Sequence, residues 1–430
     1  MIGILFSLAL LMFLAFKGMS IIWIAPICAA IVALTGGLPL LPTYTDTYMT
    51  GFVGFTKSWF PAFMLGGIFG RLMEVSGGAQ SVAHFITGLI GKKRAILAVS
   101  LGCIVLGYGG ISVFVIAFAM YPLAVAVFRE ANITRKLIPG TLAFGMFTIA
   151  MTSLPGTPQI QNLIPMQYYK TTPMAAPITG IVTSLIMFFA GYIYLVWREK
   201  KYTERGEVFI EPTGAAVATL ADVEKLPNPI LSFLPLLAVV IVLNVLKQNI
   251  IIALVAGVLL SVMVNFPAIR KNMVDVINKG ASNSVLAIIN TSAAVGFGAV
   301  VRAVPGFKTL TDMVLGIEGN ALLSEAIAVT TLAGATGSAS GGMGIALAAL
   351  GEKYVELSVS TGISLESFHR VASIASGGLD SLPHNGAILT VLAICGMTHK
   401  DSYMEMFVTT VLIPVIATLV AVVMGTMGIL

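Results

Sequence analysis

Long apolar segments alternate with short polar connections along almost the whole chain. They run at approximately 2–16, 20–36, 58–75, 95–107, 112–128, 137–152, 163–169, 174–197, 229–246, 249–266, 281–300, 321–335, 341–351, 364–378, 386–397 and 404–429. A helix needs about 20 apolar residues to cross the hydrocarbon core of a bilayer. The pattern therefore predicts an all-α polytopic membrane protein.

Several of these segments are too short to cross a bilayer alone. As a helix, the segment 95–107 would reach only about 20 Å, against a hydrocarbon core of about 30 Å. The sequence GYGG at 107–110 separates it from the segment 112–128. Basic residues flank both outer ends of this pair, and basic flanks stay on the cytoplasmic side. We therefore predict a re-entrant hairpin over about 95–128, which enters from the cytoplasm and turns near mid-membrane.

A second pair of short segments covers about 321–351 and is interrupted by GATGSASGG at 334–342. Its flanks carry several glutamates and one nearby lysine, which suits the outer face. We predict a second re-entrant hairpin here, which enters from the side opposite to the first.

The chain resembles itself at a shift of 228 residues, which indicates an internal repeat. The sequence SLP occurs at both 153–155 and 381–383, at the same distance from the two Gly-rich turns. At this shift Gly109 aligns with Gly337, and Ser112 aligns with Ser340.

Each repeat is predicted to hold three spans, a re-entrant hairpin, an interrupted span and a final span. The first repeat covers 1–197, with its interrupted span at about 137–170. The second covers 229–430, with its interrupted span at about 364–397. The polar stretch 198–228 is predicted to be a cytoplasmic linker. Since the first repeat starts outside and the second inside, the two are expected to be inverted, as in many secondary transporters.

Polar sequence interrupts the predicted helices at membrane depth in four places. These are the hairpin tips 107–112 and 334–342, and the sequences SLPGTPQIQN at 153–162 and DSLPHNG at 380–386. Irregular backbone is tolerated in a bilayer only where it is buried in protein or lines a cavity. Interrupted helices also present N-termini that attract anions and C-termini that attract cations. The four interruptions therefore predict one binding site at the midplane; four independent kinks packed against their neighbours are the alternative.

Hydroxyl, amide and glycine residues dominate these interruptions, which suits a polyol or a hydroxy acid. No Arg or Lys lies in any of the four, so we expect a small anion of low charge, held by helix termini and neutral donors. A single Ser or Thr can instead cap a helix or bond to a carbonyl. The predicted substrate-binding residues are Gly109, Gly110, Ser112, Ser153, Gly156, Thr157, Gln159, Asn162, Gly337, Ser338, Ser340, Gly341, Ser381 and Asn385.

Asp380 and His384 are titratable groups within the second interrupted span. Ionisable groups inside a membrane are costly and often act as proton relays, so we predict that this pair couples transport to protons. The alternative is that Asp380 caps a helix and His384 bonds to a carbonyl. Secondary candidates, expected to face water or to pair with one another, are Glu325, Glu366, His369 and Arg370.

Composition excludes several classes of protein. Hydrophobic residues make up 57% of the chain and charged residues 10%, and the mean hydropathy is +0.97. Soluble domains carry about a quarter charged residues, so no separate water-soluble domain is expected. The net charge of +5 comes from short basic clusters between apolar segments, which indicate cytoplasmic loops rather than a nucleic-acid partner.

No sequence motif indicates an enzyme. The three cysteines lie in apolar runs without the spacing of a disulfide or metal site, and we predict neither a cofactor nor a metal. The nucleotide-binding pattern GxxxxGK[ST] is absent from the sequence, which argues against a primary pump. The elbow GxSxG is absent as well, which argues against an intramembrane hydrolase. The first apolar segment lacks a basic n-region and a cleavage site, so we interpret it as a retained helix.

Three stretches resemble a known family of transporters. GYGGISVFVIAFAMYPLAVAVFREANITRKLIPGTLAFG, SLPGTPQIQNLIP and LPHNGAILTVLAICGMTHKDSY are similar to the gluconate permease (GntP) family, above all to its branch of D-beta-hydroxybutyrate permeases. The resemblance covers essentially the whole chain, and GTPQIQN and LPHNGA are its specific parts. The family belongs to the ion-transporter superfamily, whose members have inverted repeats, two opposed hairpins and usually a dimer. They work by an elevator motion of a transport domain against a scaffold.

The resemblance implies a proton-coupled symporter for small hydroxy-monocarboxylates, similar to 3-hydroxybutyrate or gluconate, which works as a homodimer in a bacterial-type inner membrane. DSLPHNG at the second interruption differs from the gluconate-type members, which favours a shorter acid than gluconate. Sodium-coupled relatives bind sodium through carbonyls and Ser, Thr or Asn at their hairpin tips, so sodium coupling is the alternative. A passive channel is a further alternative, which inverted repeats within one chain disfavour.

Overall fold

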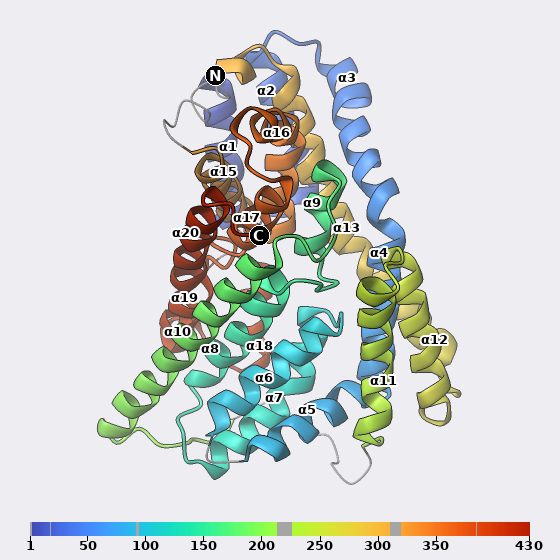
Figure 1. Cartoon of the computed structure of the whole chain (residues 1–430), viewed down its shortest axis with the longest axis vertical. Helices are drawn as coiled ribbons and strands as arrows, with labels where there is room; N and C mark the ends of the chain where they lie inside the picture. The colour runs from blue at the N-terminus through green and yellow to red at the C-terminus, as the bar shows by residue number, and fades with distance from the viewer. Residues whose placement is uncertain (1, 18, 92–93, 213–225, 310–319, 384) are drawn as a thin grey trace.

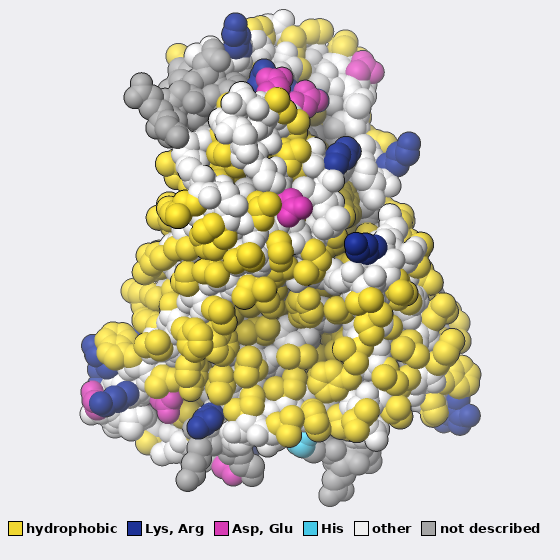
Figure 2. Space-filling model, viewed as in Figure 1, with side chains coloured by type: hydrophobic (Ala, Val, Ile, Leu, Met, Phe, Trp, Pro, Cys, Tyr) yellow, Lys and Arg dark blue, Asp and Glu magenta, His cyan; other side chains and the backbone are white. Residues whose placement is uncertain are grey.

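The computed structural model describes residues 2–17, 19–91, 94–212, 226–309, 320–383 and 385–430. Within these ranges the chain is helical and contains no strand, which confirms the prediction of an α-helical membrane protein. Among the described residues, five helices are long and apolar enough to cross a membrane: Val113–Glu130, Pro177–Glu204, Ile250–Ile269, Met273–Ala303 and His399–Thr426. Figure 2 shows a broad hydrophobic belt, with charged side chains gathered mainly above and below it.

The first half of the chain is helical from α1 to α10. Its helices are α1 (Ile2–Phe16), α2 (Ile21–Thr35), α3 (Leu40–Pro42), the π-helix η1 (Thr43–Tyr48), α4 (Met49–Val75), α5 (Gly78–Ile90), α6 (Ala95–Tyr108), α7 (Val113–Glu130), α8 (Leu137–Phe144), the π-helix η3 (Gly145–Ser153), α9 (Ile160–Tyr169) and α10 (Pro177–Glu204). The third predicted span, 58–75, is longer in the structure, since α3, η1 and α4 run on from one another, and α5 adds a helix before the first hairpin.

The helices of the second half follow after the linker. They are α11 (Pro229–Val240), the π-helix η6 (Ile241–Val245), α12 (Ile250–Ile269), α13 (Met273–Ala303), α15 (Ala321–Thr336), α16 (Ala339–Thr361), α17 (Leu365–Ser376), α18 (Gly386–Ile394), α19 (His399–Phe407), the π-helix η7 (Val408–Leu412) and α20 (Ile413–Thr426). The second hairpin is longer than expected, because α16 continues to Thr361 rather than ending near 351.

The helices α1, α2, α4, α11, α12 and α13 form one group, which we call the frame. Its most extensive contact joins α4 to α13. Small residues allow the two backbones to approach closely there: a Cβ on Gly67 would lie 2.5 Å from the carbonyl oxygen of Gly280, and one on Gly51 would lie 2.8 Å from the Cβ of Ala299. The frame thus joins helices from both halves of the chain.

The remaining helices include two helical hairpins. Hairpin 1 consists of α6 and α7, and hairpin 2 consists of α15 and α16. Figure 1 shows them at opposite ends of the molecule, hairpin 1 at the lower end, where α10 ends and the chain enters the linker, and hairpin 2 at the upper end. We call the lower end the linker end.

Each half also contains a helix that is interrupted midway. In the first half η3 ends at Ser153 and α9 begins at Ile160; in the second, α17 ends at Ser376 and α18 begins at Gly386. The first part of each interrupted helix packs against the hairpin of its own half, and the second part packs against the hairpin of the other half. Thus α9 contacts α16, and α18 contacts α7.

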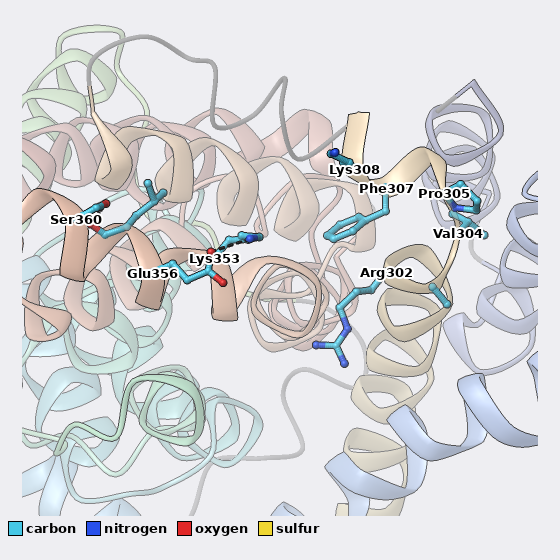
Figure 3. Close-up of a pocket in the computed structure, with 10 residues that line it drawn as sticks. Arg302, Val304, Pro305, Phe307, Lys308, Lys353, Glu356 and Ser360 are labelled. Carbon is cyan, nitrogen blue, oxygen red and sulfur yellow. Dashed lines mark hydrogen bonds and ion pairs between the residues drawn. The ribbon is translucent and has the colours of Figure 1, made fainter.

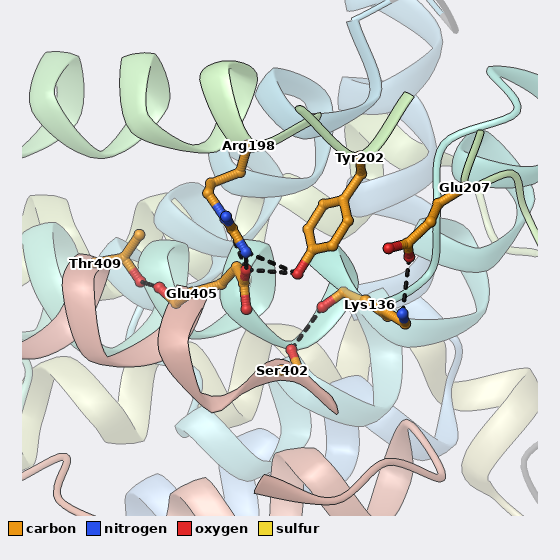
Figure 4. A network of polar contacts seen from close by, with 7 residues as sticks. All are labelled: Lys136, Arg198, Tyr202, Glu207, Ser402, Glu405 and Thr409. Atoms are coloured by element: carbon orange, nitrogen blue, oxygen red, sulfur yellow. Dashed lines mark hydrogen bonds and ion pairs between the residues drawn. The ribbon is translucent and has the colours of Figure 1, made fainter. Parts of the chain in front are cut away.

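At the linker end, polar side chains join α8, α10 and α19 (Figure 4). Glu405 accepts hydrogen bonds from Arg198 Nε at 2.9 Å and from the Tyr202 hydroxyl at 2.8 Å. Beside them, Lys136 pairs with Glu207 at 2.8 Å, and Ser402 Oγ donates to the Lys136 carbonyl at 2.6 Å. We call these residues the linker-end network.

Candidate functional site

The two interrupted helices cross where their interruptions begin. Ser373 Oγ on α17 donates a hydrogen bond of 2.6 Å to the carbonyl oxygen of Thr152 in η3. A Cβ on Gly377 would lie 2.8 Å from Thr152 Cγ2, so the backbones are close. We call residues 154–159 break 1 and residues 377–385 break 2. The crossing therefore brings the start of break 1 next to the start of break 2.

Break 1 is hydrogen-bonded to the tip of hairpin 1. Gln159 Nε2 donates hydrogen bonds to the carbonyl oxygens of Gly107, at 2.7 Å, and Ile111, at 3.1 Å. The Tyr108 hydroxyl donates to the carbonyl oxygen of Pro155 at 3.1 Å. Gly110 adopts φ +89°, which favours glycine, and turns the chain between the two arms.

Break 2 is fastened to the tip of hairpin 2 in the same manner. Asn385 Nδ2 donates to the carbonyl oxygens of Gly337 and Asp380, both at 2.9 Å. Its Oδ1 accepts from the backbone of α18 at Ala387 and Ile388, which caps that helix. Gly337 ends α15 with φ +59°. Each break is therefore joined to the hairpin of its own half by a side-chain amide.

Most of the other predicted site residues bond locally. Thr157 Oγ1 donates to the Ala150 carbonyl at 2.6 Å, Ser153 Oγ lies 2.7 Å from Ser184 Oγ, and Ser338 Oγ caps α16 at Gly341 N. The closeness of Ser153, Thr157 and Ser338 to the breaks follows the prediction, but their hydroxyls serve the backbone and neighbouring helices in this structure.

The remaining predicted residues face other helices. Ser112 stands at the N-terminus of α7 without a capping hydrogen bond from its side chain, and a Cβ on Gly109 would meet Leu236 of α11 at 2.6 Å. Gly156 adopts φ +79°, and its carbonyl accepts from Asn244 Nδ2 at 2.8 Å. Ser340 Oγ lies 3.3 Å from Thr291 Oγ1 on α13. Within the described ranges, no hydrogen bond joins the predicted side chains of hairpin 1 to those of hairpin 2.

Asp380 lies in break 2 and is buried. Its Oδ1 accepts from Ser381 Oγ at 3.1 Å, and the Ser381 carbonyl accepts from the Tyr403 hydroxyl at 3.1 Å. His384 lies outside the described residues, so the proposed pairing with Asp380 stays a prediction.

The sequence-based expectation for Arg370 and His369 was wrong. Both were expected, like Glu325 and Glu366, to face water or to pair within this group, but both are fully buried on α17. Arg370 Nη1 donates to Asn162 Oδ1 at 2.9 Å, and its Nε donates to the Ala175 carbonyl at 3.0 Å. His369 Nε2 lies 3.2 Å from the same Asn162 oxygen. A guanidinium thus adjoins break 1, where no positive charge was expected.

The Arg370 contact could not be found from local sequence, because Asn162 lies 208 residues away along the chain. One signal was present: Arg370 falls inside the apolar segment 364–378, and an ionisable residue inside a membrane segment is a candidate functional residue by default.

Two glutamates among the secondary candidates also depart from expectation. Glu366 Oε2 accepts from the Ala176 backbone N–H at 3.0 Å and so holds the loop before α10. Glu325 was expected to face water, but it is fully buried on α15, where one carboxylate oxygen accepts from the Tyr169 hydroxyl. The packing of α9, from the other half of the chain, covers it.

A cavity of about 710 Å³ lies away from the breaks, between the end of α13 and α16 (Figure 3). Its lining includes the cations Arg302, Lys308 and Lys353. Arg302 pairs with Glu352 at 3.3 Å and Lys353 pairs with Glu356 at 2.7 Å, so acidic partners offset part of the positive charge.

Comparison with known proteins identifies relatives over most of the chain. The chain is 40% identical to the uncharacterized transporter YxjC of Bacillus subtilis (strain 168), in an alignment that covers 96% of each protein. It is 24% identical to an uncharacterized permease of Haemophilus influenzae (strain KW20), over 76% of this chain and 73% of the permease. An uncharacterized transporter of the same organism is also 24% identical, over 78% of this chain and 76% of that protein. No protein-family model matches the chain.

Proposed function

Because this chain belongs to the same family of membrane transporters as YxjC of Bacillus subtilis, we propose that it is a secondary symporter, which imports a small hydroxy-monocarboxylate together with protons. The observation that carries the proposal is the crossing of the two interrupted helices, with the buried Arg370 guanidinium bonded to Asn162 beside it. Interrupted helices at a midplane site are typical of secondary transporters, and a buried cation favours an anionic substrate.

The groups around break 1 suit a hydroxy acid. A guanidinium has five N–H donors, and the described hydrogen bonds of Arg370 to Asn162, Pro173 and Ala175 use four of them. The remaining Nη1 donor is available for a carboxylate oxygen. Asn244 Oδ1, next to Gly156, is a buried acceptor without a hydrogen-bond partner among the described residues, and so suits a substrate hydroxyl. One cationic donor and one neutral acceptor fit a monocarboxylate that carries a hydroxyl.

The predicted inverted repeat has support from the order and the packing of the helices. At the shift of 228 residues, α1, α2 and α4 correspond to α11, α12 and α13, and the two hairpins correspond to each other. The hairpins lie at opposite ends of the molecule in Figure 1, as inversion requires. Each interrupted helix also contacts the hairpin of the other half.

An elevator motion would move the hairpins and interrupted helices along the frame. The contact between α13 of the frame and α16 of hairpin 2 is lined with glycines. A Cβ on Gly298 would lie 3.2 Å from Ile345 Cα, and one on Gly344 would lie 2.9 Å from Val295 Cγ2. Small residues let the two backbones approach closely at the surface where hairpin 2 would move against the frame. The homodimer, the inner-membrane location and the cytoplasmic linker stay predictions.

Uptake into proteoliposomes tests the proposal. The panel would contain 3-hydroxybutyrate, gluconate, lactate, butyrate and succinate, each with an imposed proton gradient or an imposed sodium gradient. We expect accumulation of a hydroxy-monocarboxylate under the proton gradient. Accumulation only under the sodium gradient would favour the sodium-coupled alternative, and uptake that stops at equilibrium under either gradient would favour a channel.

Substitution of Arg370 tests the site. A hydrogen bond to a charged group contributes about 1.5–3 kcal/mol, so Arg370→Lys, which keeps the charge but loses the forked geometry, should weaken substrate affinity about 10- to 150-fold. The matched control is Arg205→Lys, because Arg205 is an exposed residue just beyond α10. Equal affinity in the two variants would remove Arg370 from the substrate site.

A further inference from the structure

Glu325 differs from the other buried polar side chains of hairpin 2 because it carries a carboxyl group with no described cation beside it. It lies in the second turn of α15 and is fully buried. One oxygen accepts from the Tyr169 hydroxyl, and Oε2 has no hydrogen-bond partner among the described residues. In the same ranges, no ion pair joins a Lys, Arg or His to this carboxyl group.

Further polar groups beside Glu325 are also unsatisfied. The Tyr354 hydroxyl on α16 and Ser324 Oγ are buried without hydrogen-bond partners in the described part of the chain. The ring of Phe368 lies between the two tyrosines, with ring centroids 6.0 Å from Tyr169 and 5.9 Å from Tyr354. The cluster thus contains a carboxyl group and hydroxyls, enclosed by aromatic rings.

The helices packed against α15 bring no positive charge to this cluster. They are α1, α16, α17 and α20, and neither α1 nor α20 carries a charged residue. On α16, Glu352, Lys353 and Glu356 lie towards the exposed cavity at its outer side. On α17, His369 and Arg370 bond to Asn162 of α9, and Glu366 bonds to the loop before α10. Tyr169 of α9 and Tyr354 of α16 are the titratable groups that face the carboxyl.

These surroundings favour a protonated Glu325 in this conformation. The dipole of α15 favours a carboxylate mainly within the first turn, and Glu325 lies beyond that turn. Burying an ion without a partner is costly even after the protein relaxes. The cost of burial therefore exceeds the contribution of the dipole, and the neutral acid is the stable form while the cluster is closed.

We propose that Glu325, together with Tyr169 and Tyr354, is a proton-binding site, which carries the coupling proton across the membrane. This inference rests on the proposed symport. Glu325 belongs to hairpin 2, whereas Tyr169 belongs to α9 of the other half, so an opening of hairpin 2 away from α9 would separate the two and admit water. Hairpin 2 then closes only when a proton is bound to Glu325. The proton is released when the cluster opens to the other side of the membrane.

The cluster is distinct from the substrate site and from Asp380. Asp380 lies in break 2 and accepts a hydrogen bond from Ser381, whereas Glu325 lies at the start of hairpin 2. The two acids can therefore be tested separately. If Glu325 carries the proton, an amide in its place should uncouple transport while Asp380 is left unchanged.

The test uses the full-length protein in proteoliposomes, with the carboxylate that the wild-type protein accumulates. Glu325→Gln imitates the protonated acid in size and charge, so we expect the variant to remain folded by size exclusion. Accumulation driven by a proton gradient should fall at least about tenfold, to the equilibrium level, while counterflow exchange stays within about threefold of wild type. The matched control is Glu352→Gln, on the same hairpin, whose side chain is 84% exposed; it should behave as the wild type does.

Other outcomes overturn the inference. If Glu325→Gln accumulates substrate as the wild type does, or if a folded Glu325→Gln loses counterflow as well, Glu325 does not carry the proton. Tyr169→Phe gives a second test: it removes a donor to the carboxylate, so the pH at which exchange is half-maximal should move upward. An unchanged pH profile would contradict the inference. If the wild-type protein exchanges no carboxylate at all, the proposed function is wrong and this inference falls with it.

Discussion

Two glutamates, Glu405 and Glu325, are buried at opposite ends of the molecule, and their surroundings differ in one respect. Glu405 in the linker-end network accepts from Arg198 and Tyr202, while Glu325 accepts from a tyrosine alone. Arg198 also lies over the ring of Tyr202, with 4.7 Å between its Cζ and the ring centroid. A carboxylate with a guanidinium beside it is stable as an ion, whereas one without a cation is stable as the neutral acid. The comparison teaches that a neighbouring cation, and not burial alone, decides whether a carboxyl group holds helices together by an ion pair or exchanges a proton.

The largest expected effect concerns stability at the linker end. Removing one partner of a buried ion pair costs about 3–5 kcal/mol, so Glu405→Gln should lower the free energy of unfolding by about 3 kcal/mol, since Arg198 keeps some exposure. Glu325→Gln should lower it by less than about 1 kcal/mol, because a neutral acid is replaced by a neutral amide. Thermal unfolding in detergent measures both. Equal losses would mean that the two glutamates are in the same charge state.

Removing the cation should leave Glu405 as a buried carboxyl group without a positive partner, as Glu325 is. Arg198→Met should lower the free energy of unfolding by about 3 kcal/mol, because it removes one partner of a buried ion pair. Thermal unfolding in detergent measures the loss. An unchanged unfolding temperature would show that the Tyr202 hydroxyl alone suffices to hold the carboxyl group.

A smaller effect is expected from the ring that encloses the Glu325 cluster. Phe368→Leu removes two aromatic contacts, each worth about 0.5–1.5 kcal/mol, and gives water a path to the carboxyl group. We expect protons to leak, so that fewer substrate molecules accumulate for the same gradient. Phe188→Leu is the matched control, because Phe188 stacks on Tyr192 at 6.2 Å, away from the cluster. Leakage in both variants would attribute the effect to general loosening.

The smallest effect should come from the edge of the linker-end network. Lys136 and Glu207 form a partly exposed ion pair, and such pairs contribute about 0–1 kcal/mol. Lys136→Met should therefore change the unfolding temperature much less than Glu405→Gln does. A loss as large as that of Glu405→Gln would show that the network acts as a single unit rather than through one buried pair.

The sequence could predict the interruptions of the helices because their signals are local. Gly, Pro and polar residues at 107–112, 153–162 and 334–342 cannot continue a helix well, and the structure has helix ends in each of these places. Gln159 and Asn385, whose side-chain amides donate hydrogen bonds to the hairpin tips, lie within two of the predicted interruptions. Both side chains were expected to bind substrate, whereas in the structure they hold the hairpin tips.

The charged interior could not be predicted in the same way. The surroundings of Arg370 come from Asn162, Pro173 and Ala175, and those of Glu325 come from Tyr169, all far away in the chain. Glu325 lies near the end of an apolar segment, where a glutamate ordinarily faces water. Only the packing of α9 from the first half against α16 and α17 from the second determines that it is buried.

Each interrupted helix packs against the hairpin of the other half, and this packing has a consequence for biogenesis. The helix α9 packs against α16, which ends at Thr361, and α18 packs against α7. During synthesis the face of α9 that packs against α16 must therefore stay uncovered until nearly two hundred further residues have been made. Neither half can complete its own interior, so a gene cut at the linker should yield two fragments that fold only when they are expressed together.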